Sequence, residues 1–233
     1  MGDKHLSSQF DAELNQVSAM IMEMGGLVEQ QMRQAVEALI GYDANVADGV
    51  LRVEQQVNAM EMTIDHELTS IIGRRQPTAR DLRLLIAISR STSNLERAGD
   101  EATKIARTVR KLVDGGHARS LPSSELRVAA SMASDLLRRA LDAFARLDVQ
   151  IALDILRADN MIDAECDGFA RKLITYMMED PRTISSSLDL MFLAKSIERI
   201  GDHAKNIAES VIYIVNGLDV RHKSLQAIES ELQ

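Results

Sequence analysis

The chain has 233 residues, of which 45% are hydrophobic, 27% are charged and 3% are aromatic, and its formal net charge is −8. This length is enough for one large domain or two small ones, and the hydrophobic fraction excludes an intrinsically disordered protein. No Trp, three Pro and twelve Met make a composition typical of long helices rather than sheets. The acidic balance, without any run of Lys and Arg, argues against nucleic-acid binding.

Cysteine usage and hydropathy indicate the compartment. One cysteine, Cys166, excludes an internal disulfide framework and favours a reducing environment. Its place among apolar residues at helical spacing predicts a buried, unreactive thiol. The first residues lack the apolar core of a signal peptide, and no stretch of eighteen apolar residues predicts a membrane span. We therefore expect a cytoplasmic protein.

In the first half of the chain, apolar residues recur in a 4-3-4-3 rhythm that indicates helices packed along a heptad seam. Pro77 separates the second predicted helix from the third, because proline cannot continue a helix. Gly115 and Gly116 end the third. The predicted helices run from Ser8 to about residue 41, from Val46 to Ile71 and from Thr78 to Leu112.

The second half repeats this plan. A fourth helix is predicted from about residue 124 through Phe144, and a fifth from Ile151 to Leu173, ended by Pro181. A sixth ends at Asn216 and Gly217. Residues 115–124 are the best boundary candidate, so we expect domains at 1–116 and 117–233. The predicted fold is all-α, with six long antiparallel helices forming two tandem, pseudo-symmetric three-helix bundles.

A duplicated motif supports this division. Glu96-Arg97-Ala98-Gly99-Asp100 recurs 102 residues later as Glu198-Arg199-Ile200-Gly201-Asp202. In a helix, the Glu and Asp of each copy lie on one face, about 40° apart. Glycine inside a helix costs about 1 kcal/mol relative to alanine, so the two glycines predict a close approach of another helix.

Further carboxylates follow the apolar seam residues directly and form polar stripes beside the buried face of their helices. If stripes of neighbouring helices converge, their carboxylates raise one another's pKa unless a cation balances them. Oxygen ligands of this kind suit Mg, Mn or Fe, with Zn also possible. The candidate metal ligands are Glu96, Asp100, Glu198, Asp202, Glu54, Glu61, Asp65, Asp159 and Asp163.

A plainer interpretation stays open at this point. Acidic residues four apart are common on solvated helix faces, where Arg97 or Arg199 would simply pair with them. No Glu-x-x-His di-iron pattern, zincin motif, P-loop, Rossmann glycine pattern or nucleophile elbow is present in the sequence. The residues alone therefore predict a duplicated helical protein with acidic stripes, without naming its function.

The sequence nevertheless resembles the PhoU family of phosphate-specific transport accessory proteins over nearly its whole length. The resemblance rests on several segments in one order: 10–14, 24–31, 75–83, 96–100, 141–146, 173–180, 196–202 and 219–222. It implies two symmetric three-helix bundles, in agreement with the periodicity. It also implies multinuclear metal clusters held by Glu/Asp-x-x-x-Asp pairs, which here match Glu96 with Asp100 and Glu198 with Asp202.

The resemblance implies a negative regulator of the phosphate-starvation response that is not an enzyme. Its expected partners are the ATP-binding subunit of a phosphate ABC transporter, the cytoplasmic domain of a sensor histidine kinase and a second copy of itself. Contact with the membrane is expected only through these partners. Two alternatives remain: a metal-dependent enzyme that processes phosphate or polyphosphate, and a metal-free helical scaffold.

Overall fold

The computed structural model describes residues 8–116 and 124–232, and within them the chain forms seven α-helices, one short 3-10 helix and no strand. The α-helices are α1 (Ser8–Gly41), α2 (Ala44–Arg75), α3 (Ala79–Asp114), α4 (Ser124–Arg146), α5 (Val149–Glu179), α6 (Ile184–Asn216) and α7 (Leu225–Leu232). The 3-10 helix, η1, spans Pro181–Thr183 and leads into α6. The all-α prediction and the six long helices are confirmed. In the two described ranges, no helix is both long enough and apolar enough to cross a membrane.

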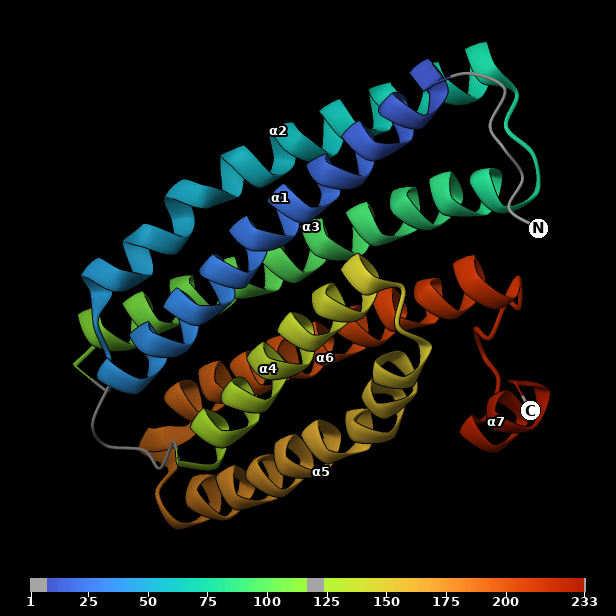
Figure 1. The fold of residues 1–233 in the computed structure, drawn as a ribbon. Coiled ribbons are helices and arrows are strands. Elements are labelled where there is room, and N and C mark those ends of the chain that lie inside the picture. The colour runs from blue at the N-terminus through green and yellow to red at the C-terminus, as the bar shows by residue number, and fades with distance from the viewer. Residues whose placement is uncertain (1–7, 117–123, 233) are drawn as a thin grey trace.

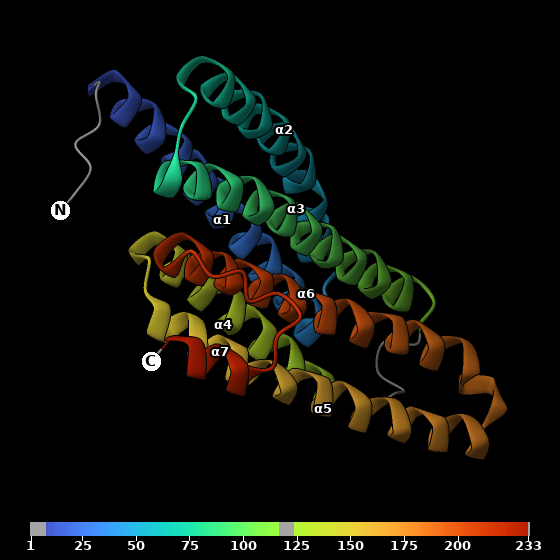
Figure 2. The same cartoon turned by 90° about the vertical axis from the view of Figure 1, so that its right-hand side faces the viewer.

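The six long helices form two bundles side by side. Helices α1, α2 and α3 pack against one another in the first, and α4, α5 and α6 in the second. Figure 1 shows the two bundles as two layers, with α2 and α5 on the outside. The view in Figure 2 shows α3 and α6 running next to each other where the layers meet. The α3–α6 pair makes the most extensive contact between any two helices, and α1 contacts α4 beside it.

Equivalent helices of the two bundles begin in the same way. Asp43 precedes α2, and its Oδ1 accepts hydrogen bonds from the backbone N–H groups two and three residues further on, at 2.8 and 3.3 Å. Asp148 does the same before α5, at 2.9 and 3.1 Å. A carboxylate in this position satisfies N–H groups that have no partner inside the helix and favours the positive end of its dipole. The pairing of these two residues supports the duplication.

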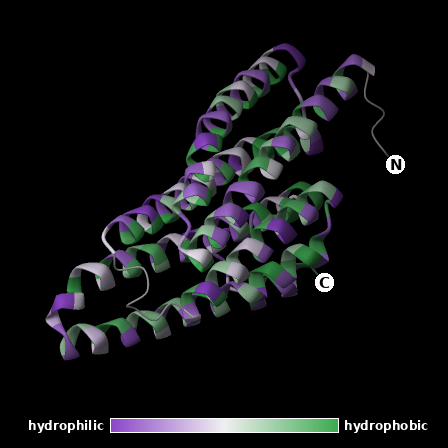
Figure 3. Ribbon diagram, turned by 90° about the vertical axis from the view of Figure 1, so that its left-hand side faces the viewer, coloured by the Kyte–Doolittle hydropathy of each residue, from purple (hydrophilic) through white to green (hydrophobic). Residues whose placement is uncertain are grey.

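The predicted seams point inward. Figure 3 shows hydrophobic and hydrophilic residues alternating along the helices, and the hydrophobic core is formed by residues from all six long helices. On α1 the heptad residues are buried as expected: Leu14, Val17, Ile21, Met24 and Val28. Residues 117–123 lie outside the described ranges, so the predicted linker and the exact domain boundary remain predictions.

Helix α7 was not predicted. It has eight residues, too few for apolar periodicity to show in the sequence. Ile228 is buried, and Nε of Arg157 on α5 donates a hydrogen bond to Glu229 at 3.1 Å. The C-terminal segment is thereby held against the second bundle.

Two adjacent glycines of α1 test the packing between the bundles. A Cβ at Gly25 would lie 2.5 Å from Cδ2 of buried Leu141 on α4, whereas a Cβ at Gly26 meets nothing within 4 Å. We expect Gly25→Ala to lower the free energy of unfolding by about 1 kcal/mol, because overpacking outweighs the gain in helix propensity. Gly26→Ala should raise it by up to about 1 kcal/mol. Urea denaturation of both variants checks this, and stabilisation by Gly25→Ala would contradict the close α1–α4 contact.

Candidate functional site: two carboxylate clusters and the groove between them

The glycines of the duplicated motif lie where helices approach closely. A Cβ at Gly99 would be 2.9 Å from Oε1 of Gln31, which is fully buried on α1. A Cβ at Gly201 would be 3.1 Å from Cδ1 of Ile162 on α5. The expectation of close helix approach is therefore confirmed in both copies.

The first carboxylate cluster lies between α2 and α3 and consists of Glu61, Asp65, Glu96 and Asp100. Burial and then the neighbouring Asp65 raise the pKa of Glu61, although the Ser93 hydroxyl donates to its Oε1 at 3.4 Å. Burial, Asp100 and Glu61 raise the pKa of Glu96. Within the described ranges, none of the four carboxylates has a Lys, Arg or His nitrogen within ion-pair distance. Negative charge in this cluster is therefore poorly balanced.

The second cluster lies between α5 and α6 and consists of Asp159, Asp163, Glu198 and Asp202. Burial raises the pKa of Asp163 and Asp202, and the other carboxylates of the cluster raise both further. Two cations lie within this cluster. Nζ of Lys205 is 2.7 Å from Oδ2 of Asp159, which is 3% exposed, and Lys195 pairs with Glu198. The second cluster is thus partly neutralised by lysines, unlike the first.

Glu54 belongs to neither cluster. It pairs with Arg107 of α3, with the guanidinium nitrogen 3.1 Å from its Oε2. The structure therefore brings eight of the nine candidate ligands into two groups of four, so the stripes of neighbouring helices do converge. The ninth is held by an ion pair.

Among the described residues, the carboxylate clusters have the oxygen donors of a metal site but not its geometry. No three Asp, Glu, His or Cys side chains in residues 8–116 and 124–232 are placed so that they could hold one metal ion. The oxygen donors and the carboxylates with raised pKa suit a hard cation in ligand type and charge. The donor set fits such a metal, although the arrangement does not enclose one. Metal binding remains a prediction.

The buried thiol is confirmed. Cys166 is 4% exposed, its Sγ donates to the carbonyl oxygen of Ala194 at 3.5 Å, and burial raises its pKa to about 12. A thiol protonated at neutral pH is a poor nucleophile and a poor metal ligand. Cys166 therefore belongs to the core of the second bundle.

Two ionisable residues at the contact between α3 and α6, Glu101 and His203, were not among the predicted site residues. Oε1 of Glu101, a residue 4% exposed, accepts hydrogen bonds from Nζ of Lys104 at 2.9 Å and Nη1 of Arg199 at 3.2 Å. Burial raises the pKa of Glu101, but the hydrogen bonds from Lys104, Ser196 and Arg199 outweigh it and leave the pKa below its usual range. Arg199 therefore pairs across the two bundles and not with the carboxylates of its own motif.

The position equivalent to Glu101 in the second copy holds a histidine. His203 Nδ1 lies 3.1 Å from Oδ1 of Asn94, and burial followed by the charge of Arg97 lowers the pKa of His203 to about 4. The imidazole is therefore neutral at pH 7. Alignment of the two motif copies, with attention to where they differ, could have singled out both residues.

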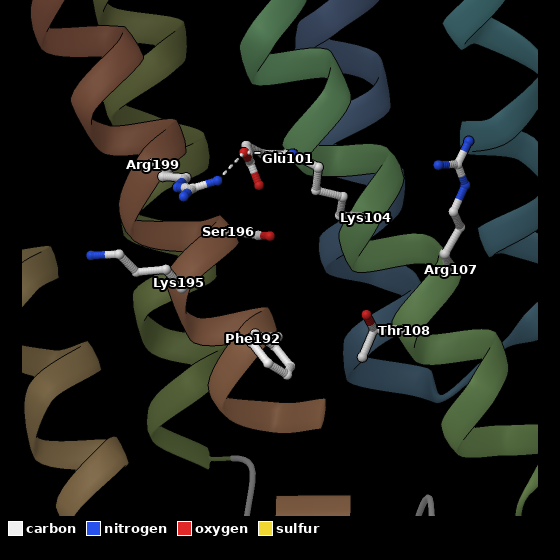
Figure 4. A pocket seen from close by; sticks show the side chains of 8 residues that line it. All are labelled: Glu101, Lys104, Arg107, Thr108, Phe192, Lys195, Ser196 and Arg199. Carbon is white, nitrogen blue, oxygen red and sulfur yellow. Dashed lines mark hydrogen bonds and ion pairs between the residues drawn. The ribbon is translucent and has the colours of Figure 1, made fainter. Parts of the chain in front are cut away.

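An open groove runs between α3 and α6 beside Glu101, with a volume of about 360 Å³. Figure 4 shows α3 on one side and α6 on the other, with Phe192 and Ser196 on α6 and Thr108 on α3. Its lining is Glu101, Lys104, Arg107, Thr108, Phe192, Lys195, Ser196 and Arg199. We call this the α3–α6 groove. It contains four cationic side chains in a chain whose net charge is −8.

The chain matches a protein-family model and several known proteins over most of its length. The family model described as "PhoU domain" matches residues 21–109 and 126–211, one match in each bundle. The chain belongs to the PhoU family. Its sequence is 49% identical to a phosphate-specific transport system accessory protein PhoU homolog of Pseudomonas putida, over 98% of this chain and 89% of the relative. It is 46% identical to the accessory protein PhoU of Escherichia coli, over 94% and 90%.

Solved structures of PhoU proteins have the same fold. The crystal structure of PhoU from Pseudomonas aeruginosa superimposes with a TM-score of 0.87 at 47% identity, over 90% of this chain and all of that one. The phosphate transport system regulatory protein PhoU from Streptococcus pneumoniae gives a TM-score of 0.82 at 26% identity, over 90% and 98%. The tandem helical bundles of the PhoU family are thus present here.

Proposed function

We propose that this chain is a negative regulator of the phosphate-starvation response that acts as an adaptor and not as an enzyme. The observation that carries the proposal is the likeness, over almost the whole chain, to accessory proteins of phosphate-specific transport. A relative from Streptococcus pneumoniae is named as a regulatory protein of the same system. An accessory role in phosphate transport is therefore the core of the proposal, and the following points extend it.

The adaptor would act in the cytoplasm and join two partners. When phosphate is plentiful, it would bind the ATP-binding subunit of the phosphate ABC transporter and the cytoplasmic domain of a sensor histidine kinase. It would thereby restrain phosphate uptake and hold the kinase inactive. Long helices with exposed outer faces offer the extended surfaces that such docking needs. We propose that the working form is a homodimer.

The two carboxylate clusters would hold divalent or trivalent metal ions, Fe, Zn, Mn or Mg. A bound cation would supply the positive charge that the clusters lack, and so stabilise the ionised carboxylates. In the first cluster Glu61, Asp65, Glu96 and Asp100 would be the ligands. In the second, Lys195 and Lys205 would have to leave Glu198 and Asp159 before those carboxylates could bind metal.

A deletion strain tests the regulatory role. Without this chain, a phosphate-starvation reporter should be active even in high phosphate, and a plasmid copy should restore repression. A deletion strain that keeps normal repression would contradict the proposal. Turnover of phosphoesters by the pure, metal-loaded protein would instead favour the metalloenzyme alternative.

Elemental analysis tests the clusters directly. Protein purified without added metal or a His-tag should contain stoichiometric metal. The variant Glu96→Ala/Asp100→Ala/Glu198→Ala/Asp202→Ala should lose it while its helical circular dichroism is retained. Asp135→Ala/Asp142→Ala is the matched control, since these half-exposed carboxylates on α4 pair with Arg138 and with no other cation among the described residues. A metal-free wild type that still represses would turn the clusters into docking surfaces or simple solvated faces.

A further inference from the structure

In the α3–α6 groove the positive charges are exposed to solvent and the negative charges lie beneath them. Each of its four cations pairs with a carboxylate that is more buried than itself. Lys104 and Arg199 pair with Glu101, Arg107 with Glu54 and Lys195 with Glu198. The cationic side chains are 49% to 60% exposed, whereas their carboxylate partners are 5% to 23% exposed. The face that meets solvent is therefore positive, although the chain as a whole is acidic.

An apolar stripe on α6 continues this cationic face. Ile184, Leu188 and Phe192 are 42%, 42% and 68% exposed and follow one another at intervals of four residues. With about 100° of rotation per residue, these three residues lie within about 80° of one another, and Lys195 and Arg199 fall within the same arc. One face of α6 thus presents three large apolar side chains and then two cations.

This combination indicates a protein ligand. Single exposed apolar residues are ordinary, but an aligned stripe that includes an aromatic residue beside arginines is typical of a protein interface. A small anion would use the cations and leave Ile184, Leu188 and Phe192 in water. An acidic amphipathic helix can cover both, with its apolar side chains on the stripe and its carboxylates against the rim of the groove.

We propose that the α3–α6 groove and the stripe Ile184–Leu188–Phe192 form a docking surface for an acidic amphipathic helix of a partner protein. This inference rests on the proposed adaptor function and assigns that function a surface. Phe192 would be the apolar anchor. Arg107 and Lys195, at the outer edges of the groove in Figure 4, would pair with acidic side chains of the bound helix.

Binding to the two proposed partners tests the surface. The full chain is titrated calorimetrically with the purified ATP-binding transporter subunit and with the purified cytoplasmic domain of the kinase. Phe192→Ser should weaken binding to at least one of them tenfold or more. The matched control is Met62→Ser, which removes a 74% exposed side chain from α2 and should change the affinity less than twofold.

Charge is tested separately with Arg107→Gln/Lys195→Gln. These two residues are chosen because Glu54 and Glu198, at 23% exposure, remain accessible to water after their partners are lost, whereas Glu101 would not. The double variant should bind more weakly and show a smaller loss of affinity as salt rises. Wild-type affinity in both Phe192→Ser and the double variant would overturn the docking surface.

If neither purified partner binds the wild type, the adaptor proposal fails. The docking surface is then tested independently of that proposal. A photoreactive benzophenone amino acid in place of Phe192 is cross-linked in cells, and the attached peptide is sequenced. The expected product is a segment of another protein with apolar residues at helical spacing flanked by Asp or Glu. No cross-link, a cross-link to a second copy of this chain or one to a segment without acidic residues would overturn the inference.

Discussion

Replacement of Glu61, Glu96, Asp163 and Asp202 by their amides is expected to raise the melting temperature of the metal-free protein by several degrees at pH 7. In the folded chain the pKa of each of these carboxyl groups is raised, by burial first and by neighbouring carboxylates next. Such a group stabilises the fold below its unfolded pKa, and this contribution is lost as pH rises through the folded pKa. At pH 7 the ionised clusters therefore destabilise the fold, and the uncharged amides remove the repulsion.

The pH dependence of the melting temperature tests whether repulsion between ionised carboxylates causes this effect. The difference in melting temperature between variant and wild type should shrink toward zero below about pH 4, where the wild-type carboxyls are protonated as well. His203 titrates in both proteins, so its effect cancels. If the clusters hold metal as proposed, added metal should reverse the order, because the amide variant has lost four of the carboxylate ligands. An amide variant that is less stable at pH 7 without metal would show that the clusters are not repulsive.

Glu125 provides the control of opposite sign. Nζ of Lys172 donates to its carboxylate at 2.5 Å, and this bond is the main cause that lowers the pKa of Glu125 to about 2. Its contribution to stability is present above the unfolded pKa and is lost as pH falls toward about 2. Glu125→Gln should therefore lower the melting temperature at pH 7, while the cluster variant raises it.

Phe169→Ala is expected to lower the free energy of unfolding by about 3–5 kcal/mol. Phe169 of α5 is 1% exposed and is among the largest fully buried side chains, so truncation removes apolar burial and leaves a cavity. For a chain of this size, the loss corresponds to a fall in melting temperature of about 6–20 °C. Urea and thermal denaturation measure both quantities.

Phe192→Ala is the matched control for this prediction. It makes the same chemical change on the neighbouring helix, at a side chain that is 68% exposed. Its effect on stability should stay within about 0.5 kcal/mol. A loss below 1 kcal/mol for Phe169→Ala would mean that the second bundle is less tightly packed than the structure shows.

Much of the fold was predictable because helical information is local. Heptad spacing fixed which side of α1 is buried, Pro77 and Pro181 marked interruptions, and the equivalent Asp43 and Asp148 proved to cap equivalent helices. The carboxylate clusters were predictable for the same reason: a residue that follows the seam must lie beside the buried face. Such residues form clusters wherever neighbouring helices bring their stripes together.

The α3–α6 groove could not be predicted, because it forms between two helices that are far apart in the sequence. Lys104 and Arg107 of α3 meet Lys195 and Arg199 of α6 only because the two bundles pack through these helices. Helical periodicity describes a face of one helix but not which distant helix covers it. Glu54 illustrates the same limit, since it shares a stripe on α2 with Glu61 and Asp65 but pairs with Arg107 of α3.

At Glu101 and His203 the two halves of the chain differ at equivalent positions, and these two residues meet where the halves pack together. They occupy equivalent positions and line the same small pocket between α3 and α6. Two identical halves placed together there would set glutamate against glutamate or histidine against histidine. A buried acid beside a neutral imidazole requires two halves that differ at this position, as the halves of this chain do. Such a chain is in effect a covalently joined heterodimer, whose two subunits can diverge independently while their partnership is kept.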